Sequence, residues 1–248
     1  MAMIKRERIQ RPEERIILPL DFPSFQDARP FIVLLKDHVG LFKIGLTLFM
    51  NEGLEVVKKV EAVAPNRKIF LDLKLYDTPW QVGGAVAALV SKTKAIRFVT
   101  VHSSGGARVL RAAVEAMDGK TGILGVTVLT SMNASELSQV GIAARVEDQV
   151  LALAGLAKAA GAVGVVASAH EVSSIRKTCG KNFLIVTPGI RPSWSQISND
   201  DQRRMMTPAE AVTKGADYLV VGRPIISNKD PIGAAMKIAD EIEAASAP

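Results

Sequence analysis

Short apolar runs, rich in β-branched residues, recur along the whole chain and alternate with segments of helical spacing. Runs of this length and composition predict buried strands, and the segments between them predict helices with one apolar face. The helical segments include residues 24–39, 107–117 and 146–161. A last segment, residues 231–245, begins with a proline, which is common in the first turn of a helix. The apolar runs end at Asp21, Gly45, Lys74, His102, Thr130, Ser168, Gly189 and Gly222.

Eight strand-then-helix units within 248 residues are typical of a (β/α)8 TIM barrel. We therefore predict one α/β barrel domain over residues 1–248, in which residues 1–14 form a basic N-terminal extension. The alternative fold is an open, doubly wound sheet. A G-x-G-x-x-G turn after the first strand would favour that alternative, and the sequence has no such turn there.

Polar side chains occur at or just after the ends of these apolar runs. In TIM barrels the active site lies at the face formed by the C-terminal ends of the strands. Charges at the ends of the first three predicted strands and of the last two therefore predict a functional site at that face. The polar residues in these positions are Asp21, Lys43, Asp72, Lys74, His102, Thr130, Arg191 and Arg223.

The most informative stretch is residues 70–82, FLDLKLYDTPWQV, in which a buried strand acquires three charges. Asp72 and Lys74 are two residues apart, so in a regular strand their side chains point to the same side. Asp77 lies in the turn beyond the strand. One interpretation is an ion pair that fixes the strand register, although buried ion pairs add little stability. A second lysine, Lys43, and the third carboxylate favour the other interpretation, a functional site.

Two stretches that combine glycine with arginine predict a phosphate site. TPGIR follows the seventh predicted strand and VVGRPI follows the eighth. The loops after these two strands often bind phosphate in TIM barrels, partly through backbone N–H groups. Gly222 would allow the backbone to approach an anion, and Arg223 offers paired donors. The polar segment 191–207 is long for a connection in a compact domain, which favours a functional loop.

Histidine and cysteine add little to this chemistry. His102 is a candidate general acid or base, but a strand-end histidine beside a glycine-rich turn is more often a local hydrogen-bonding residue, which we favour. The three histidines are far apart, and the sequence has no convincing metal-ligand spacing. A lone cysteine, Cys179, excludes an intrachain disulfide framework and predicts a reducing compartment. We expect its thiol to be inert.

The charge balance favours anionic ligands without identifying them. The chain has 31 Lys and Arg against 25 Asp and Glu, a net charge of +6, and five of the cations lie in the first fifteen residues. We expect that basic segment to be solvated, because it lacks the aromatic residues or motif of a nucleic-acid arm. No apolar run reaches the ~18 residues of a membrane span, and no signal-peptide core is present. We therefore predict a cytoplasmic protein that binds neither nucleic acid nor membrane.

The stretch LDLKLYDTP resembles the D-x-K-x-x-D motif of the orotidine 5'-monophosphate decarboxylase family. The order and spacing of LPLD, FKIGLTLF, VHSSGG, VTVLTSM, TPGIRP, DQRRMMTP and VVGRPI agree with that family as well. The similarity covers nearly the whole chain from Arg15 onward. It implies a TIM barrel that removes carbon dioxide from orotidine 5'-monophosphate, gives uridine 5'-monophosphate and needs no cofactor.

The resemblance also implies roles for the charged residues. Lys74 would be the proton donor, and Asp72 would lie beside the substrate carboxylate. Asp21 and Lys43 would hold the ribose hydroxyls, with Lys43 also part of the catalytic charge network. Asp77 would enter the active site of a partner subunit, so the family pattern implies a homodimer.

The remaining matching positions would bind the rest of the substrate. Thr130, with Ser131 next to it, would lie near the pyrimidine. Pro188 and Arg191 belong to the substrate loop that begins TPGIR. The residues that would hold the phosphate are Gln202, Gly222 and Arg223.

The chain departs from the family pattern just after the motif. The common continuation is D-I-P-N-T, but here Asp77 is followed by Thr78, Pro79, Trp80 and Gln81. Gln81 replaces a threonine whose hydroxyl normally crosses the dimer interface, so we expect an altered contact there.

Two alternative functions remain open at this point. The D-x-K-x-x-D motif is shared with magnesium-dependent enzymes, 3-keto-L-gulonate-6-phosphate decarboxylase and hexulose-6-phosphate synthase. Their motif continues as D-A-G, whereas Asp77 is followed by Thr78 and Pro79. The other alternative is a non-catalytic barrel that binds phosphate or nucleic acid, for which basic residues should spread over an outer face. Here they gather at strand ends.

Overall fold

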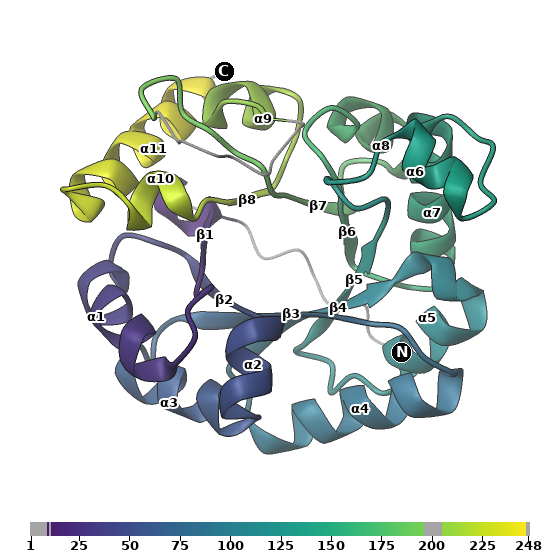
Figure 1. Cartoon of the computed structure of the whole chain (residues 1–248), viewed down its shortest axis with the longest axis horizontal. Coiled ribbons are helices and arrows are strands. Elements are labelled where there is room, and N and C mark those ends of the chain that lie inside the picture. Colours follow the sequence, from purple (N-terminus) through teal and green to yellow (C-terminus); the bar gives the residue numbers. More distant parts are fainter. Residues whose placement is uncertain (1–8, 10, 196–204, 247–248) are drawn as a thin grey trace.

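The predicted barrel is confirmed by the structure, a computed structural model that describes residue 9 and residues 11–195 and 205–246. Eight parallel strands close into a barrel in chain order, with β8 pairing to β1 (Figure 1). The strands are β1 (Ile16–Pro19), β2 (Leu41–Gly45), β3 (Lys68–Leu75), β4 (Ile96–His102), β5 (Gly122–Val126), β6 (Gly164–Val166), β7 (Leu184–Thr187) and β8 (Tyr218–Val220).

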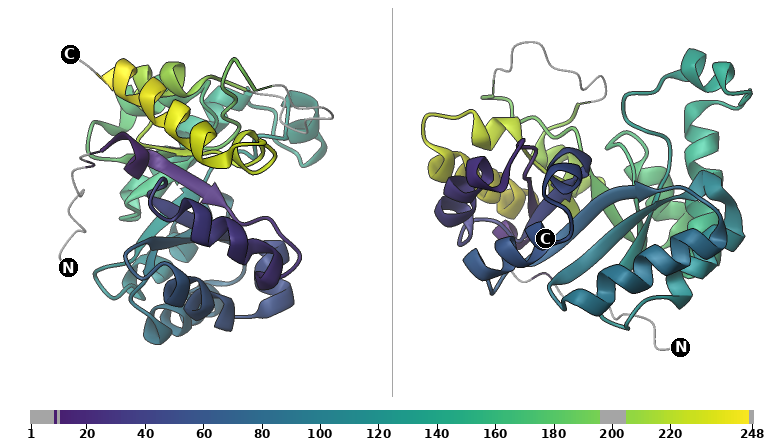
Figure 2. Two further views of the ribbon diagram at one scale, coloured as in Figure 1. Left: turned by 90° about the vertical axis from the view of Figure 1, so that its left-hand side faces the viewer. Right: turned by 60° about the horizontal axis from the view of Figure 1, so that its bottom comes forward.

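Helices surround this barrel on its outside (Figure 1). The α-helices are α1 (Phe25–Leu35), α2 (Leu46–Glu52), α3 (Glu55–Val63), α4 (Pro79–Lys92), α5 (Gly106–Glu115), α6 (Ala134–Gln139), α7 (Val146–Ala159), α8 (Val172–Cys179), α9 (Pro208–Thr213), α10 (Arg223–Ile226) and α11 (Pro231–Ser246). Two 3-10 turns, η1 (Pro12–Arg15) and η2 (Ser103–Gly105), complete the set. The segment around α6 projects beyond the barrel (Figure 2, right). None of the helices described is long and apolar enough to cross a membrane.

Apolar side chains fill two separate regions. The larger lies between the strands and the surrounding helices, where helix faces such as Val56, Val57 and Val60 of α3 are buried. The smaller lies inside the barrel, where Phe98 contacts Phe70 and Tyr218 edge to face, with ring centroids 6.2 and 5.6 Å apart. This inner cluster fills the inside of the barrel with apolar side chains.

Part of the expected N-terminal extension belongs to the barrel. η1 precedes β1 and packs against α11, and Ile9 packs on the inner apolar cluster. The backbone of Glu14 lies so close to Gly40 that a Cβ there would be 2.1 Å from the Glu14 carbonyl oxygen. The rest of the expected extension, residues 1–8 and 10, lies outside the described residues.

Some strands end earlier than the apolar runs. The run through β5 continues to Thr130, but β5 ends at Val126, which pairs with Val166 at the end of the short strand β6. Thr127 still donates to the Val166 carbonyl from its amide and its hydroxyl. Because no further partner follows in β6, the chain then leaves the sheet and residues 128–130 turn toward the barrel mouth.

The pairing of β3 with β4 is irregular at the charged motif. Leu71 pairs with Val99 and Leu75 with Val101, so three residues of β3 face the single residue Thr100 of β4. Within this bulge Lys74 has φ +49°, and it is the only non-glycine residue with a positive φ in the described part of the chain. A left-handed backbone is unfavourable for a residue with a Cβ. The two-residue spacing alone therefore does not explain how this lysine is placed.

Candidate active site

A pocket of about 360 Å³ opens at the C-terminal ends of the strands, as predicted. This volume suits a small-molecule ligand. Residues from the ends of β1, β2, β3, β5, β7 and β8 line it. The predicted site residues among them are Asp21, Lys43, Asp72, Lys74, Thr130, Pro188, Arg191, Gly222 and Arg223.

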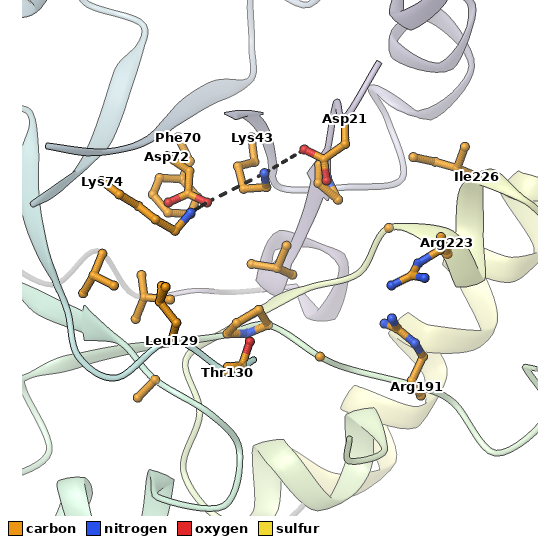
Figure 3. Close-up of a pocket in the computed structure, with 18 of the residues that line it drawn as sticks. Asp21, Lys43, Phe70, Asp72, Lys74, Leu129, Thr130, Arg191, Arg223 and Ile226 are labelled. Atoms are coloured by element: carbon orange, nitrogen blue, oxygen red, sulfur yellow. Dashed lines mark hydrogen bonds and ion pairs between the residues drawn. The ribbon is translucent and has the colours of Figure 1, made fainter. Parts of the chain in front are cut away.

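Four of these side chains form a continuous network of alternating charge (Figure 3). The Lys43 ammonium lies 2.9 Å from Asp21 Oδ1 and 3.7 Å from Asp72 Oδ2. The Lys74 ammonium lies 2.8 Å from the same oxygen of Asp72. Burial of an ammonium is costly unless it is paired, and Lys43 is only 8% exposed. Its two carboxylate neighbours meet that requirement and fix the charge at the centre of the network.

The register of the first three strands brings this network together. Pro19 of β1 pairs with Lys43 of β2, which pairs with Phe70 of β3. Gly45, at the end of β2, pairs with Asp72. A Cβ at Gly45 would lie 3.0 Å from the Lys43 ammonium and 3.1 Å from Asp21 Oδ1, so a larger residue would press on this ion pair.

Two arginines form the other end of the pocket. The guanidinium groups of Arg191 and Arg223 face each other. They lie on the side of the pocket opposite Asp72 and Lys74 (Figure 3). Arg191 follows β7, and Arg223 begins the short helix α10 after β8. A Cβ at Gly222 would lie 2.7 Å from Pro19 Cγ, so glycine allows β8 to pack closely on β1 at this point. Two convergent guanidinium groups suit an oxyanion such as a phosphate.

Apolar residues form most of the remaining wall, and sequence reasoning missed them. They come from the floor of the barrel and from the ends of β1, β5, β6, β8 and α10. Phe70 had a usable signal, because it is two residues before Asp72 and therefore points inward. The others have no signal that separates them from ordinary core residues. They are Pro19, Phe22, Val126, Val128, Leu129, Val166, Ala167, Val220 and Ile226.

Two predicted residues do not line the pocket of their own chain, and a third cannot be placed. Asp77 is exposed in the turn after β3, where its Oδ1 accepts a hydrogen bond of 2.5 Å from the Thr78 amide. Ser131 is exposed and does not line the pocket, although Thr130 does. Gln202 lies outside the described residues.

His102 and Cys179 do not line the pocket either. The His102 ring lies edge-on to Tyr76, with ring centroids 5.6 Å apart. Burial lowers the pKa of His102, the Lys74 ammonium lowers it further, and Asp72 opposes the shift. This direction favours the neutral form of the imidazole over the imidazolium that a general acid needs. Cys179 is buried at the end of α8, and burial raises the pKa of its thiol, which agrees with an inert residue.

Metal-binding potential is low in the described ranges. They contain no group of three or more His, Cys, Asp or Glu residues arranged to hold a metal ion. The carboxylates of Asp21 and Asp72 both contact Lys43.

Known proteins show the same architecture and closely similar sequences. A sequence model of the "Orotidine 5'-phosphate decarboxylase / HUMPS family" matches residues 14–238. The orotidine 5'-phosphate decarboxylase of Desulfosudis oleivorans is 42% identical, with 99% of each chain covered. The enzyme of the same name from Anaeromyxobacter dehalogenans is 46% identical, with 92% of this chain and 98% of that one covered. A crystal structure of orotidine 5'-phosphate decarboxylase from Lactobacillus acidophilus is 34% identical, with a TM-score of 0.78, and covers 92% of this chain and 98% of that one.

Proposed function

The chain belongs to the orotidine 5'-phosphate decarboxylase / HUMPS family, and on this premise we propose how its pocket carries out the reaction. The protein decarboxylates orotidine 5'-monophosphate to uridine 5'-monophosphate, the last step of de novo pyrimidine nucleotide synthesis. The observation that carries the residue roles is the charge network of Asp21, Lys43, Asp72 and Lys74 in a pocket whose other end holds two arginines.

Lys74 is the proton donor. Loss of carbon dioxide breaks the bond between carbon 6 and the carboxylate and leaves the electron pair on carbon 6. The ring offers this carbanion little resonance relief, so the enzyme must stabilise it with charges that are already in place. The Lys74 ammonium supplies that positive charge and then transfers a proton to carbon 6. The neutral amine recovers its proton from solvent when the product leaves.

Asp72 keeps Lys74 charged and oriented. An opposite charge 2.8 Å from the ammonium favours its protonated form and fixes the direction of its N–H bonds. The carboxylate of the substrate lies beside Asp72, and the repulsion between them is relieved when carbon dioxide departs. Lys43 limits this repulsion before the reaction, because it contacts both Asp72 and Asp21. Asp21 and Lys43 also hold the ribose hydroxyls.

The phosphate binds between Arg191 and Arg223, with the Gly222 backbone and Gln202 as further contacts. Pro188 shapes the start of the loop that carries Arg191. This group is remote from the breaking bond, so its binding energy can order the loops of the pocket around the reacting ring. The two guanidinium groups provide charged hydrogen-bond donors that bind the phosphate. Thr130, with Ser131 next to it in the chain, lies near the pyrimidine, and the apolar wall beside Thr130 limits water at carbon 6.

The reaction needs no metal. We expect the rate of orotidine 5'-monophosphate loss, followed by ultraviolet absorbance, to be unchanged after treatment with a chelator in metal-free buffer. The rate should not change, because the groups that stabilise and protonate carbon 6 are side chains of the protein. A chelator-sensitive rate restored by Mg²⁺ would instead support the magnesium-dependent branch of the family.

The functional unit is a homodimer in which Asp77 completes the site of the partner subunit. Asp77 lies at the same barrel end as the pocket but does not line it, so it is available to a neighbouring chain. Large apolar side chains are exposed near it: Tyr76 is 66% exposed and Trp80 is 87% exposed. Met50 of α2 is 73% exposed as well. Exposed apolar side chains of this size support an interaction surface at this end of the barrel.

A mixture of two inactive variants tests this sharing of sites. Asp77→Ala and Lys74→Ala should each lack activity, but a heterodimer of the two contains one intact site. After unfolding and refolding together in equal amounts, about one quarter of all sites should be intact, as expected for random two-fold pairing. The activity per chain measures this fraction. Activity that stays at the level of the single variants would contradict a shared site.

A cytoplasmic location completes the proposal. Its support is the cysteine usage, a single buried thiol, which is typical of proteins in reducing compartments.

A further inference from the structure

We propose that Thr100 is a positioning residue for the reaction, because its one hydroxyl group connects the backbone of Lys74 to the carboxylate of Asp72. The inference rests on the proposed roles of those two residues. Thr100 lies in the middle of β4, is fully buried and does not line the pocket. It therefore acts on the substrate only through the two residues that it contacts.

The first contact holds the Lys74 backbone. The Thr100 hydroxyl accepts a hydrogen bond of 2.8 Å from the Lys74 amide. This amide lies inside the β3 bulge, where three residues face Thr100 and the ordinary ladder of backbone hydrogen bonds is interrupted. The hydroxyl takes the place of a backbone carbonyl there. It thereby stabilises the left-handed conformation of Lys74, which a residue with a Cβ adopts only when its surroundings hold it.

The second contact sets the rotation of the Asp72 carboxylate. The same hydroxyl donates its proton to Asp72 Oδ1 at 3.1 Å. With Oδ1 held by β4, Oδ2 faces the pocket, where it lies 2.8 Å from the Lys74 ammonium and 3.7 Å from the Lys43 ammonium. The two oxygens thus have separate tasks, one structural and one electrostatic.

Only a residue that accepts and donates at the same time can make both contacts. A hydroxyl group does so, whereas valine, which has nearly the same shape, does neither. Other buried threonines of the barrel use their hydroxyls differently. Thr121 donates to the Ile96 carbonyl and Thr127 to the Val166 carbonyl. These bonds join neighbouring strands and reach no charged side chain.

Three variants isolate the hydroxyl group of Thr100. We expect Thr100→Val to lower kcat by about 10- to 100-fold, because small displacements of reacting groups have effects of this size, and to change KM much less. Thr100→Ser and Thr100→Ala both lack the γ-methyl group, so their difference is the hydroxyl alone. Thr100→Ser should keep kcat within about threefold of the wild type, and Thr100→Ala should resemble Thr100→Val. This pair remains informative if Thr100→Val does not fold.

Thr121→Val is the matched control. This variant removes the buried hydrogen bond from the Thr121 hydroxyl to the Ile96 carbonyl, at the end of the barrel opposite the pocket. It should lower the melting temperature without changing kcat. Equal kcat for Thr100→Ser and Thr100→Ala would overturn the inference, as would a loss of kcat in Thr121→Val as large as in Thr100→Val.

The wild-type enzyme is assayed beside these variants with orotidine 5'-monophosphate as the substrate. If it shows no turnover, the proposed function fails; if it is active and the Thr100 variants are normal, only the positioning role fails.

Discussion

Replacing Lys74 with alanine is expected to lower kcat by at least about 10⁴-fold. The variant loses a general acid, worth about 10²–10⁴-fold, and a preorganised charge, worth about 10²–10³-fold. The phosphate end of the pocket stays intact, so the product uridine 5'-monophosphate should still bind measurably. Single-turnover absorbance measurements give the rate, and calorimetry gives the product affinity. A Lys74→Ala enzyme that works near the wild-type rate would refute the assignment.

Lys68→Ala is a suitable control for this experiment. Lys68 is the first residue of the same strand, β3, and it is exposed at the end of the barrel opposite the pocket. Its removal changes the net charge of the protein as much as Lys74→Ala does. We expect its kcat and KM to match the wild type. An equal loss of activity in both variants would mean that overall charge, and not the position of one ammonium, controls the rate.

The second large effect is expected at the other end of the pocket. Arg223→Ala should raise KM for orotidine 5'-monophosphate by about 10²- to 10⁴-fold, because each hydrogen bond to a charged group contributes about 1.5–3 kcal/mol and a guanidinium group can make two. Turnover of the nucleoside orotidine, which lacks the phosphate, should be equally slow in the variant and the wild type. Steady-state kinetics with both substrates measures this loss of discrimination.

Arg108→Ala provides the comparison for Arg223→Ala. Arg108 is exposed on α5, away from the pocket. We expect the variant to discriminate between nucleotide and nucleoside as the wild type does. If Arg223→Ala also retained full discrimination, the phosphate would have to bind elsewhere.

The sequence predicted the barrel and most of its polar site for one physical reason. In a closed parallel sheet the carboxyl ends of all strands meet at one face, so charged residues at the ends of apolar runs must converge. Asp21, Lys43 and Arg223 were found in this way. The pattern cannot report the exact strand ends, because these depend on where the neighbouring strand stops, as Val126 shows at β5.

Lys74 lines the pocket beside Asp72, but its backbone is not the one that the sequence pattern implied. The two-residue spacing from Asp72 implied a regular strand, but the structure has a bulge and a left-handed backbone at Lys74. Nothing in the local sequence marks the bulge, whose Lys74 amide and Asp72 carboxylate are held by the hydroxyl of Thr100 in the next strand. The apolar wall was missed for a related reason, since Val128 and Ile226 look like core residues until the barrel brings them to the mouth.

The seam between β1 and β8 has a consequence for the newly made chain. The acid–base half of the pocket comes from residues 21–74, whereas the anion-binding half comes from residues 188–223. Ile17 pairs with Val220, so the two halves meet only when the last strand has left the ribosome. A truncated translation product that ends before β8 contains Asp72, Lys74 and Arg191 but lacks Gly222 and Arg223, so its pocket is left without part of its anion-binding half.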